Sequence, residues 1–348
     1  MAHDTAPIRP EEAFDEARVG AYLREHIADL VGDADIIFDQ FPGGAANLTY
    51  RAVAGDVELV LRRAPLGPVA KGAHDIEREY RVLSRLWRAF PQAPRAYLYC
   101  DDPDIMGKPF VVMERRTGYV VRASWPPGFG EDVAVRRHLA SELVETLADL
   151  HLVDPTAVGL DDLGHPDGFV ERQIAGWALR WDAAKTRSVP AMDDARRLLE
   201  RDEPVPQAVS VLHNDYKLDN TMVSAAGDLV AVFDWDMATR GDPLVDVGTL
   251  LAYWADPDGP TYPVFGERAV TLTPYMPKAE VAARYAQRSG LDLSGVHYYE
   301  GLALYRIAVI IEQIYGRFIA GQTSDERFAR FEPLAPLLAE AAVEVLRG

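Results

Sequence analysis

The feature that most constrains this chain lies within residues 208–236, where two apolar runs are each followed by acidic or amide side chains. The first apolar run, 208–212, precedes Asp215 and Asn220, and the second run, 229–233, leads directly to Asp234. Apolar runs of this length predict buried strands, so both acidic residues are expected at strand ends. Rigid scaffolds commonly hold catalytic side chains at such positions.

These residue types, in this order, suit phosphoryl transfer. One carboxylate receives the proton of the attacking hydroxyl, while an amide oxygen and a second carboxylate hold magnesium against the nucleotide phosphates. The protein-kinase catalytic loop, H-R-D-x-x-x-x-N, precedes a metal-binding Asp in the same way, and His213, Asp215, Asn220 and Asp234 fit that pattern. Asp and Asn are also ordinary turn residues, but the flanking apolar runs favour catalysis. We therefore predict an ATP-dependent small-molecule kinase that uses Mg²⁺, with GTP as an alternative donor.

Composition limits the other classes of function. The chain has 348 residues, which suits two domains or one domain with large insertions. Its 54 acidic and 36 basic side chains give a formal net charge of -18, which argues against a nucleic-acid partner. A single cysteine, a start without basic and apolar leader regions, and no run of 18 apolar residues predict a cytoplasmic protein without a membrane partner. The oligomeric state stays open.

Hydrophobic periodicity predicts an α+β chain with two lobes. A tail and a helix occupy residues 1–34, and a β-rich lobe with one main helix follows over 35–115. Within it, strands are expected near 36–38, 48–53, 57–62, 96–99 and 109–113, and a helix over 74–89. Residues 116–130 read as a linker, and 131–348 as a large helical lobe. Its helices are expected near 131–150, 168–187, 191–201, 242–255, 279–289, 297–320 and 333–347.

Several segments together resemble a known family. The segments are H-N-D-Y-K-L-D-N, V-F-D-W-D-M-A-T-R-G-D-P-L-V-D-V-G, G-G-A-A-N-L-T-Y-R, L-V-L-R-R and E-R-E-Y-R-V-L. They resemble the aminoglycoside phosphotransferase/choline kinase-like family over about residues 35–320, and more narrowly the kinase-like domains fused to acyl-CoA dehydrogenases. This resemblance implies a two-lobed protein-kinase-like fold with a nucleotide cleft between the lobes. It also implies a small hydroxylated acceptor, either an aminoglycoside or a hydroxyacyl or other metabolic alcohol.

The resemblance implies a role for each residue of the motif. Asp215 would be the catalytic base or positioning carboxylate, and Asn220 and Asp234 would ligate magnesium. Asp236 would assist through water, and His213 would hold the loop backbone by hydrogen bonds without shuttling protons.

Further positions would support this site. Asp242 and Asp246 resemble positions that brace the catalytic loop, and Asp242 before Pro243 is also typical of a helix N-cap. Gly43 and Gly44 would let phosphate approach the backbone. Met113 and Glu114 would lie where the strand reaches the hinge between the lobes, at the adenine.

One departure from the family pattern opens an alternative. The third-strand Lys of such kinases, which pairs with a helical Glu, is replaced by Arg62, with Glu79 as the expected partner and Glu77 as the alternative. Arg keeps the charge but not the geometry of an ammonium. The chain could therefore be a weak or silent nucleotide-binding pseudokinase. A solvated edge-strand pair, Arg62 and Arg63, is the structural alternative.

Two more interpretations stay open. A metal-dependent phosphohydrolase could use Asp215, Asp234 and Asp236, although it would not need the glycine turn or the Arg62–Glu79 pair. Trp177 and Trp181 could line an acceptor pocket, although aromatic residues one helical turn apart more often belong to a core.

Overall fold

The computed structural model describes residues 4–42, 47–66, 75–122, 125–126, 129, 132–254, 256, 276–323 and 325–348. Gly43 and Gly44, predicted to contact phosphate, lie outside these residues. The chain divides into two compact units. Unit 1 comprises Met1–Gly118, Val158–Leu160 and Val230–Ala238, and unit 2 comprises Tyr119–Ala157, Asp161–Leu229 and Thr239–Gly348. No helix among the described residues is long and apolar enough to cross a membrane.

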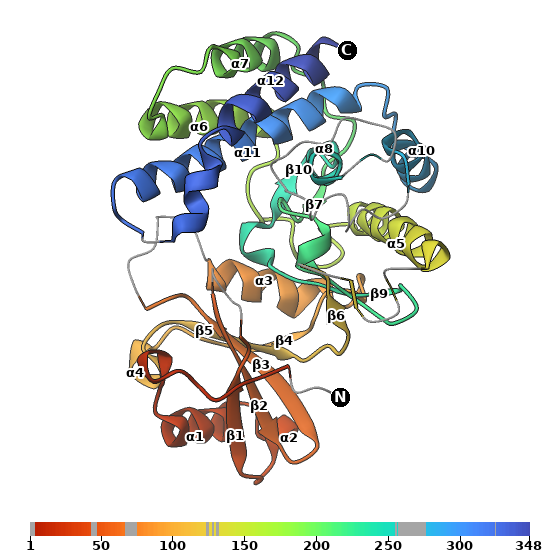
Figure 1. Ribbon diagram of the computed structural model, residues 1–348. Coiled ribbons are helices and arrows are strands. Elements are labelled where there is room, and N and C mark those ends of the chain that lie inside the picture. The colour runs from red at the N-terminus through yellow and green to blue at the C-terminus, as the bar shows by residue number, and fades with distance from the viewer. Residues whose placement is uncertain are drawn as a thin grey trace. The chain divides into compact units, whose positions relative to one another are not determined.

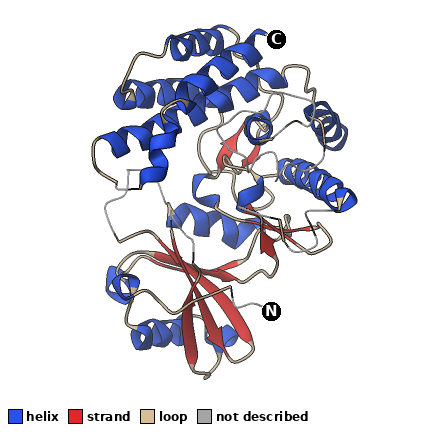
Figure 2. Ribbon diagram, in the orientation of Figure 1, coloured by secondary structure: helices blue, strands red, loops and turns tan. Residues whose placement is uncertain are grey.

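Unit 1 is built on a five-stranded antiparallel sheet in the order β1-β2-β3-β5-β4 (Figures 1 and 2). The strands are β1 (Ile36–Gln40), β2 (Leu48–Ala54), β3 (Val57–Arg63), β4 (Ala96–Cys100) and β5 (Phe110–Glu114). The helical elements of this unit are η1 (Pro10–Glu12), α1 (Glu16–His26), α2 (Ala28–Val31), α3 (Ile76–Leu86), α4 (Pro103–Met106) and η3 (Trp235–Met237). The five predicted strands and the main helix are confirmed.

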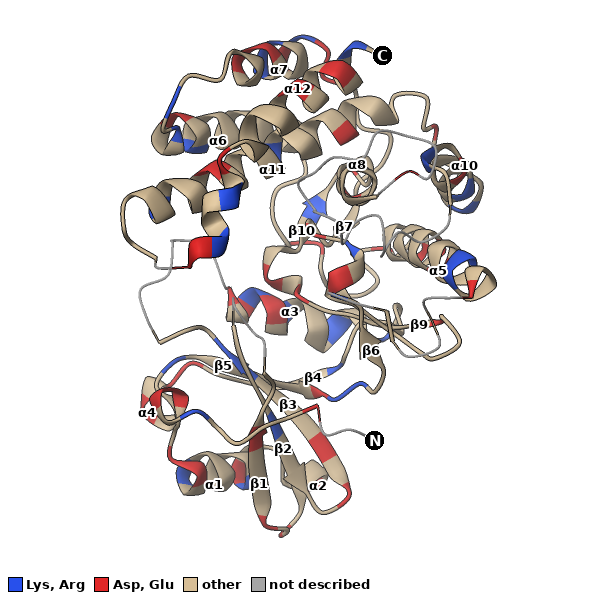
Figure 3. Ribbon diagram, in the orientation of Figure 1, with Lys and Arg blue, Asp and Glu red and all other residues tan. Residues whose placement is uncertain are grey.

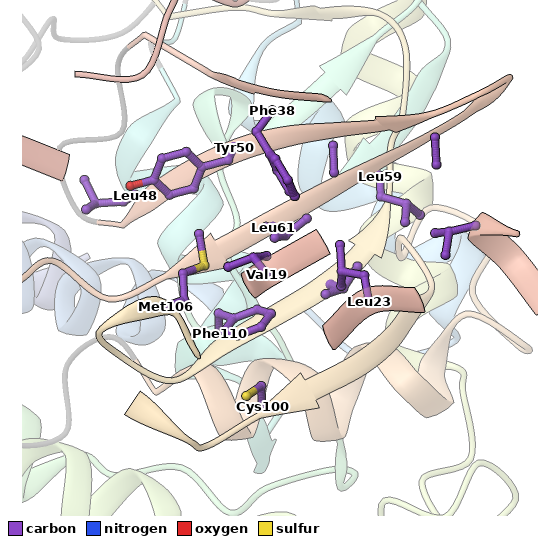
Figure 4. Packing of buried hydrophobic residues seen from close by; sticks show 14 residues of the cluster. Val19, Leu23, Phe38, Leu48, Tyr50, Leu59, Leu61, Cys100, Met106 and Phe110 are labelled. Carbon is purple, nitrogen blue, oxygen red and sulfur yellow. The ribbon is translucent and has the colours of Figure 1, made fainter. Parts of the chain in front are cut away.

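The core of unit 1 lies where α1 and α4 meet the sheet. Figure 4 shows Val19 and Leu23 of α1 beside Leu59 and Leu61 of β3, with Phe110 of β5 in the same cluster. Successive side chains of a strand point to opposite faces. Leu59, Leu61 and Arg63 therefore share the face that meets α1, and the intervening Arg62 is directed to the other face, which carries α3.

Arg63 holds the N-terminal segment to this core. Its guanidinium donates to the carbonyls of Met106 and Glu12 and to the hydroxyl of Tyr50, and only 1% of the residue is exposed. The strand that carries it, β3, is the middle strand of the sheet, so the solvated edge-strand interpretation of Arg62 and Arg63 is wrong. Ala6 exchanges two backbone hydrogen bonds with Gln40 of β1, both 2.8 Å long. Residues 4–12 are therefore tied to the sheet edge, where the sequence had suggested a loose tail.

Unit 2 is mostly helical, with α11 packed against α6, α7, α8 and α12 (Figure 1). The helices are α5 (Val133–His151), α6 (Phe169–Ala184), α7 (Pro190–Arg201), α8 (Leu244–Tyr253), α10 (Lys278–Ser289), α11 (Val296–Ile319) and α12 (Leu334–Arg347). All seven were predicted, with boundaries that differ by a few residues at most. The predicted stripe on α5 is confirmed, since Leu139, Leu143, Leu147 and Leu150 are all fully buried.

Short strands and turns position the loop that carries Asp215 and Asn220. β7 (Ser210–Leu212) pairs with β10 (Thr239–Gly241), and β6 (Tyr119–Val120) pairs with β8 (Thr221–Val223). The element η2 (Leu218–Asn220) lies within this loop, and η5 (Glu326–Phe331) precedes α12. The strand β9 (Leu229–Val232) falls mostly within unit 1. The strands β7 and β9 were predicted from their apolar runs. The two- and three-residue strands β6, β8 and β10 were not, because such short segments carry no readable periodicity.

A matched pair of glycines tests the contact between α8 and α11. A Cβ at Gly248 of α8 would overlap the backbone carbonyl of Tyr299, whereas a Cβ at Gly316 of α11 would meet Thr186 and Ala184 at 3.5 and 3.6 Å. We expect Gly248→Ala to lower the free energy of unfolding by about 1–3 kcal/mol, because the helices must move apart. Gly316→Ala should raise it by up to about 1 kcal/mol through helix propensity. Urea unfolding measures both, and equal effects would contradict this close approach.

Candidate active site

The loop that follows β7 is fixed by a buried carboxylate. Asp246, the third residue of α8, is fully buried, and its two oxygens accept hydrogen bonds from the backbone N–H groups of His213 and Asn214, each 2.7 Å long. Asn214 has a positive φ of 71°, a conformation that Asn adopts more readily than most residues. The N–H of Asp215 then donates to Nδ1 of His213 at 3.2 Å. The side chains of Asp246 and His213 therefore hold the backbone of this loop from His213 to Asp215.

A histidine and a tyrosine extend this network. Nε2 of His151, at the end of α5, lies 3.3 Å from Asp246 Oδ2, and its Nδ1 lies 2.7 Å from the hydroxyl of Tyr285 on α10. Burial opposes ionisation of Asp246. Nevertheless the hydrogen bond from His151, together with the nearby His151 and His213 rings, lowers the pKa of the Asp246 carboxyl below its ordinary value. Three helices of unit 2 thus converge on one ionised carboxylate.

Asp242 has the structural position that its sequence context suggested. Its Oδ1 accepts a hydrogen bond from the N–H of Leu244, the first residue of α8, at 3.0 Å, and its Oδ2 accepts one from the hydroxyl of Tyr299 at 2.5 Å. Only 2% of the residue is exposed, and burial raises the pKa of its carboxyl. Asp242 therefore caps α8 and fixes α11 against it, which keeps Asp246 in place.

The carboxylate of Asp215 faces two side chains of its own loop. Its Oδ2 accepts hydrogen bonds from Lys217 Nζ at 2.6 Å and from Asn220 Nδ2 at 2.9 Å. Asn220 Nδ2 also donates to the Asp215 carbonyl at 2.9 Å, so the amide oxygen of Asn220 is the atom that remains for a cation. The predicted base and the predicted amide ligand are therefore neighbours in unit 2.

Lys217 is the site residue that sequence reasoning missed. Its side chain is 17% exposed, and its Nζ lies 5.1 Å from the ring centroid of Tyr253. Burial lowers its pKa, but the charges of Asp215 and its neighbours outweigh burial and raise the pKa of Lys217 above the ordinary value. The signal in the sequence was a single cation inside the loop, two positions after the expected base. A cation so placed can meet negative charge that develops on a transferred phosphoryl group.

Unit 1 contains the other half of the predicted set. Arg62 Nη1 lies 2.5 Å from Glu79 Oε1, so the expected Arg62–Glu79 pair is present, while the alternative partner, Glu77, is exposed on α3. Arg62 Nη2 also pairs with Asp234, a contact that was not predicted. Asp234 directly precedes η3 and has a positive φ of 69°. The side chains of Arg62 and Glu79 are 12% and 1% exposed, so this is a largely buried pair.

The charges around Arg62 affect the ionisation of Glu79. Burial, together with the charges of Asp234 and Asp236, raises the pKa of Glu79 to about 7, although Arg62 acts in the opposite direction. Asp236 is itself 8% exposed, and its backbone carbonyl accepts a hydrogen bond from Arg78 at 3.4 Å. Glu79, Asp234 and Asp236 thus all act on the surroundings of Arg62. Carboxylate oxygens are preferred ligands of Mg²⁺, so Asp234 has the chemistry of the predicted ligand, although no group of three His, Cys, Asp or Glu in the described part of the chain is placed to hold a metal ion.

The remaining candidates, Met113 and Glu114, end β5. Met113 is 5% exposed and stands opposite Val60 in the sheet, and the N–H of Glu114 donates to the Arg95 carbonyl at 2.8 Å. Their place at the end of a buried strand agrees with the sequence pattern. Contact with adenine stays a prediction for both residues.

Comparison with known proteins identifies the family. A family model described as "Phosphotransferase enzyme family" matches residues 38–295. The chain belongs to this phosphotransferase family. The structure of a putative aminoglycoside phosphotransferase from Ralstonia eutropha is 29% identical with a TM-score of 0.81, covering 96% of this chain and 99% of that one. The ternary complex of the phosphotransferase APH(4)-Ia with ADP and hygromycin B is 16% identical with a TM-score of 0.60, over 94% and 99% of the two chains, and shares the fold.

Relatives of this phosphotransferase include much longer proteins. Acyl-CoA dehydrogenase family member 11 of Rattus norvegicus is 32% identical over 356 residues, which cover 100% of this chain and 45% of the relative. Family member 10 of Mus musculus is 29% identical over 97% of this chain and 32% of its own length. The chain therefore spans less than half the length of these relatives. The predicted resemblance and the predicted kinase-like fold are confirmed, with a small antiparallel sheet in one unit and mostly helices in the other.

Replacing the carboxylate of Asp246 tests the brace of the loop. In Asp246→Asn one oxygen becomes an amide nitrogen, which cannot accept the second backbone N–H, so a buried donor is left without a partner. We expect the free energy of unfolding to fall by about 3 kcal/mol. The control is Asp149→Asn, which removes an exposed pair with Arg288 and should have little effect. Urea unfolding of both variants measures the difference. Similar losses of unfolding free energy in the two variants would show that Asp246 stabilises the protein no more than an exposed carboxylate does.

The same carboxylate gives a pH dependence of known sign. Because the folded-state pKa of Asp246 lies below its ordinary value, its contribution is complete above about pH 4 and is lost as the pH falls through the folded-state pKa. We therefore expect the gap in unfolding free energy between wild type and Asp246→Asn to narrow as the pH falls below about 4. Contributions of the other carboxylates cancel in this difference. A gap that widens on acidification would contradict the assignment.

Proposed function

We propose that this phosphotransferase moves the γ-phosphate of ATP to a hydroxyl group of a small molecule, with Mg²⁺ as cofactor. The observation that carries the proposal is the braced loop of unit 2, in which Asp215 is held between Lys217 and Asn220. Phosphoryl transfer passes through a loose transition state, so catalysis depends on positioning and on neutralising charge. A carboxylate fixed by the backbone bonds of Asp246 is suited to the positioning part.

Each residue has a proposed task. Asp215 orients the acceptor hydroxyl and receives its proton as the bond to phosphorus forms. Lys217 meets the negative charge that develops on the phosphoryl oxygens. The Asn220 amide oxygen and the Asp234 carboxylate would hold Mg²⁺, which when bound neutralises the nucleotide phosphates. The positive charge and planar donor geometry of Arg62 suit the nucleotide phosphates.

One observation favours a second candidate. Arg62 is paired with Asp234, so the carboxylate proposed for Mg²⁺ already has a cationic partner. A bidentate guanidinium holds a carboxylate in fixed geometry more firmly than an ammonium does. If that pair persists with nucleotide bound, the chain would bind nucleotide without efficient turnover.

Substitution of two aspartates separates these candidates. We expect Asp215→Asn to lower kcat by about 10²–10⁴-fold, because the proton acceptor is lost, while Mg·ATP still raises the melting temperature. Asp234→Asn should abolish the part of that shift which depends on Mg²⁺. The measurements are ADP release with a panel of hydroxylated metabolites and aminoglycosides, and thermal shift with Mg·ATP and Mg·GTP.

The control for both variants is Asp228→Asn, which changes an exposed carboxylate that pairs with His138. It should behave as wild type. Turnover in Asp215→Asn equal to that of wild type would remove Asp215 from the reaction. A wild-type shift with Mg·ATP, together with ADP release no faster than in Asp215→Asn, would establish a silent nucleotide-binding protein. Phosphate release from esters without ATP would instead indicate a phosphohydrolase.

A further inference from the structure

Two arginines share one tryptophan beside the catalytic loop of unit 2. Trp177 lies on α6, which packs against α11. The guanidinium carbon of Arg180, one turn along α6, lies 4.5 Å from the centroid of the Trp177 ring, and that of Arg306 on α11 lies 5.4 Å from it. Figure 3 marks basic residues on both helices. Cation–π contacts account for one arginine on a tryptophan, whereas two guanidinium groups on one ring also repel each other.

Arg306 is buried, and it contacts neutral groups. Only 6% of the residue is exposed, and its guanidinium donates to Asn214, to Oδ1 at 3.4 Å and to the backbone carbonyl at 3.1 Å. Among the described residues, no carboxylate forms an ion pair with Arg306 or with Arg180. Burial, and then repulsion from Arg180, lower the pKa of Arg306 against the attraction of Asp215 and Asp246.

Two partly buried arginines of this chain are neutralised by carboxylates. Arg62 pairs with Glu79 and Asp234, and Arg187 pairs with Glu312, a fully buried carboxylate. A buried charge without a partner is costly, and such charges are normally paired. Arg63 is also buried among neutral groups, but Arg306 differs from it because a second guanidinium, that of Arg180, lies on the same tryptophan. A bound anion would supply the missing partner and relieve the repulsion between the two guanidinium groups.

The position of Arg180 and Arg306 puts them next to the loop that is proposed to bind the acceptor. Arg306 holds Asn214, the residue directly before Asp215, so a group bound on the arginines lies next to the loop that orients the acceptor hydroxyl. Arg180 is exposed on α6 and can reach a ligand from solvent. Ile310, one turn beyond Arg306 on the same face of α11, is 36% exposed and offers an apolar neighbour.

We propose that Arg180 and Arg306, supported by Trp177, bind an anionic group of the acceptor, a carboxylate or a phosphate ester. This inference rests on the proposed function and narrows its acceptor to hydroxylated anions. A polycationic acceptor such as hygromycin B would be repelled by these two guanidinium groups and would be disfavoured. The paired N–H donors of a guanidinium match the oxygens of a carboxylate and those of a phosphate, so acceptors with either group need to be tested.

The test uses Arg180, because Arg306 also holds the catalytic loop. The variants are Arg180→Gln, which removes the charge, and Arg180→Lys, which keeps the charge but not the fork. The matched control is Arg197→Gln on α7, which removes an equal charge at an exposed position paired with Asp194. The acceptors are short hydroxycarboxylates with their amides, glycerol phosphate with glycerol, and hygromycin B, at constant ionic strength.

We expect wild type to prefer the anionic member of at least one pair by about 10-fold or more in kcat/KM, as one charge-assisted contact gives. Arg180→Gln should remove most of this preference by raising KM for the anion, while KM for the neutral member stays unchanged. Arg180→Lys should be intermediate, and Arg197→Gln should match wild type. The carboxylate and phosphate pairs show which anion is recognised. Equal use of both members in wild type, a preference for hygromycin B, or an unchanged preference in Arg180→Gln would overturn the inference.

A binding measurement separates this inference from the kinase proposal. Malonate, a small dianion, should raise the melting temperature of wild type and Arg197→Gln without nucleotide, and raise that of Arg180→Gln less. Equal malonate shifts in all three proteins would overturn the anion site even if the chain is a kinase. A malonate shift lost only in Arg180→Gln, together with no ADP release from any acceptor, would keep the anion site and reject the kinase.

Discussion

The hydrogen bonds of the ionised Asp246 carboxylate are the interaction on which the loop of Asp215 depends. A loop in which Asn214 has a positive φ is not the conformation that the chain would choose by local preference. The two backbone N–H groups that it presents must find acceptors away from water, and one carboxylate with two oxygens satisfies both. Because that carboxylate sits on α8, and α8 is fixed by Asp242 and α11, the position of Asp215 is determined by contacts between helices.

In the middle strand of the unit 1 sheet, successive side chains point to opposite faces, so two neighbouring arginines have different partners. In β3, Arg63 points to the α1 face and binds carbonyl groups of the N-terminal segment, whereas its neighbour Arg62 points to the α3 face and binds Glu79 and Asp234. The same residue type therefore has two tasks one position apart. A shift of one residue in the register of β3 would exchange them, which is why the fully paired central strand matters for the site.

The sequence predicts contacts that depend on local periodicity or on a known motif, and it does not predict contacts between other residues that are far apart in the chain. The stripe of α5, the cap of α8 by Asp242, and the Arg62–Glu79 pair depend on periodicity or on a motif with known spacing. The contact of Arg62 with Asp234 joins residues 172 positions apart, and that of Arg306 with Asn214 joins residues 92 positions apart. No local pattern encodes these contacts. Lys217 was within the motif, but its importance became visible only when its distance to Asp215 was known.

The net charge of the chain conceals two local clusters of opposite charge. Three carboxylates lie around Arg62, and on Trp177 there are two guanidinium groups with no carboxylate paired to them in the described part of the chain. A ligand of opposite sign stabilises such a cluster. In the proposed reaction, a magnesium nucleotide would bring a cation to the first and an anionic acceptor would bring its charge to the second. A net charge of -18 by itself would have suggested a cationic acceptor, but in our proposal recognition depends on the few charges that lie next to the loop of Asp215.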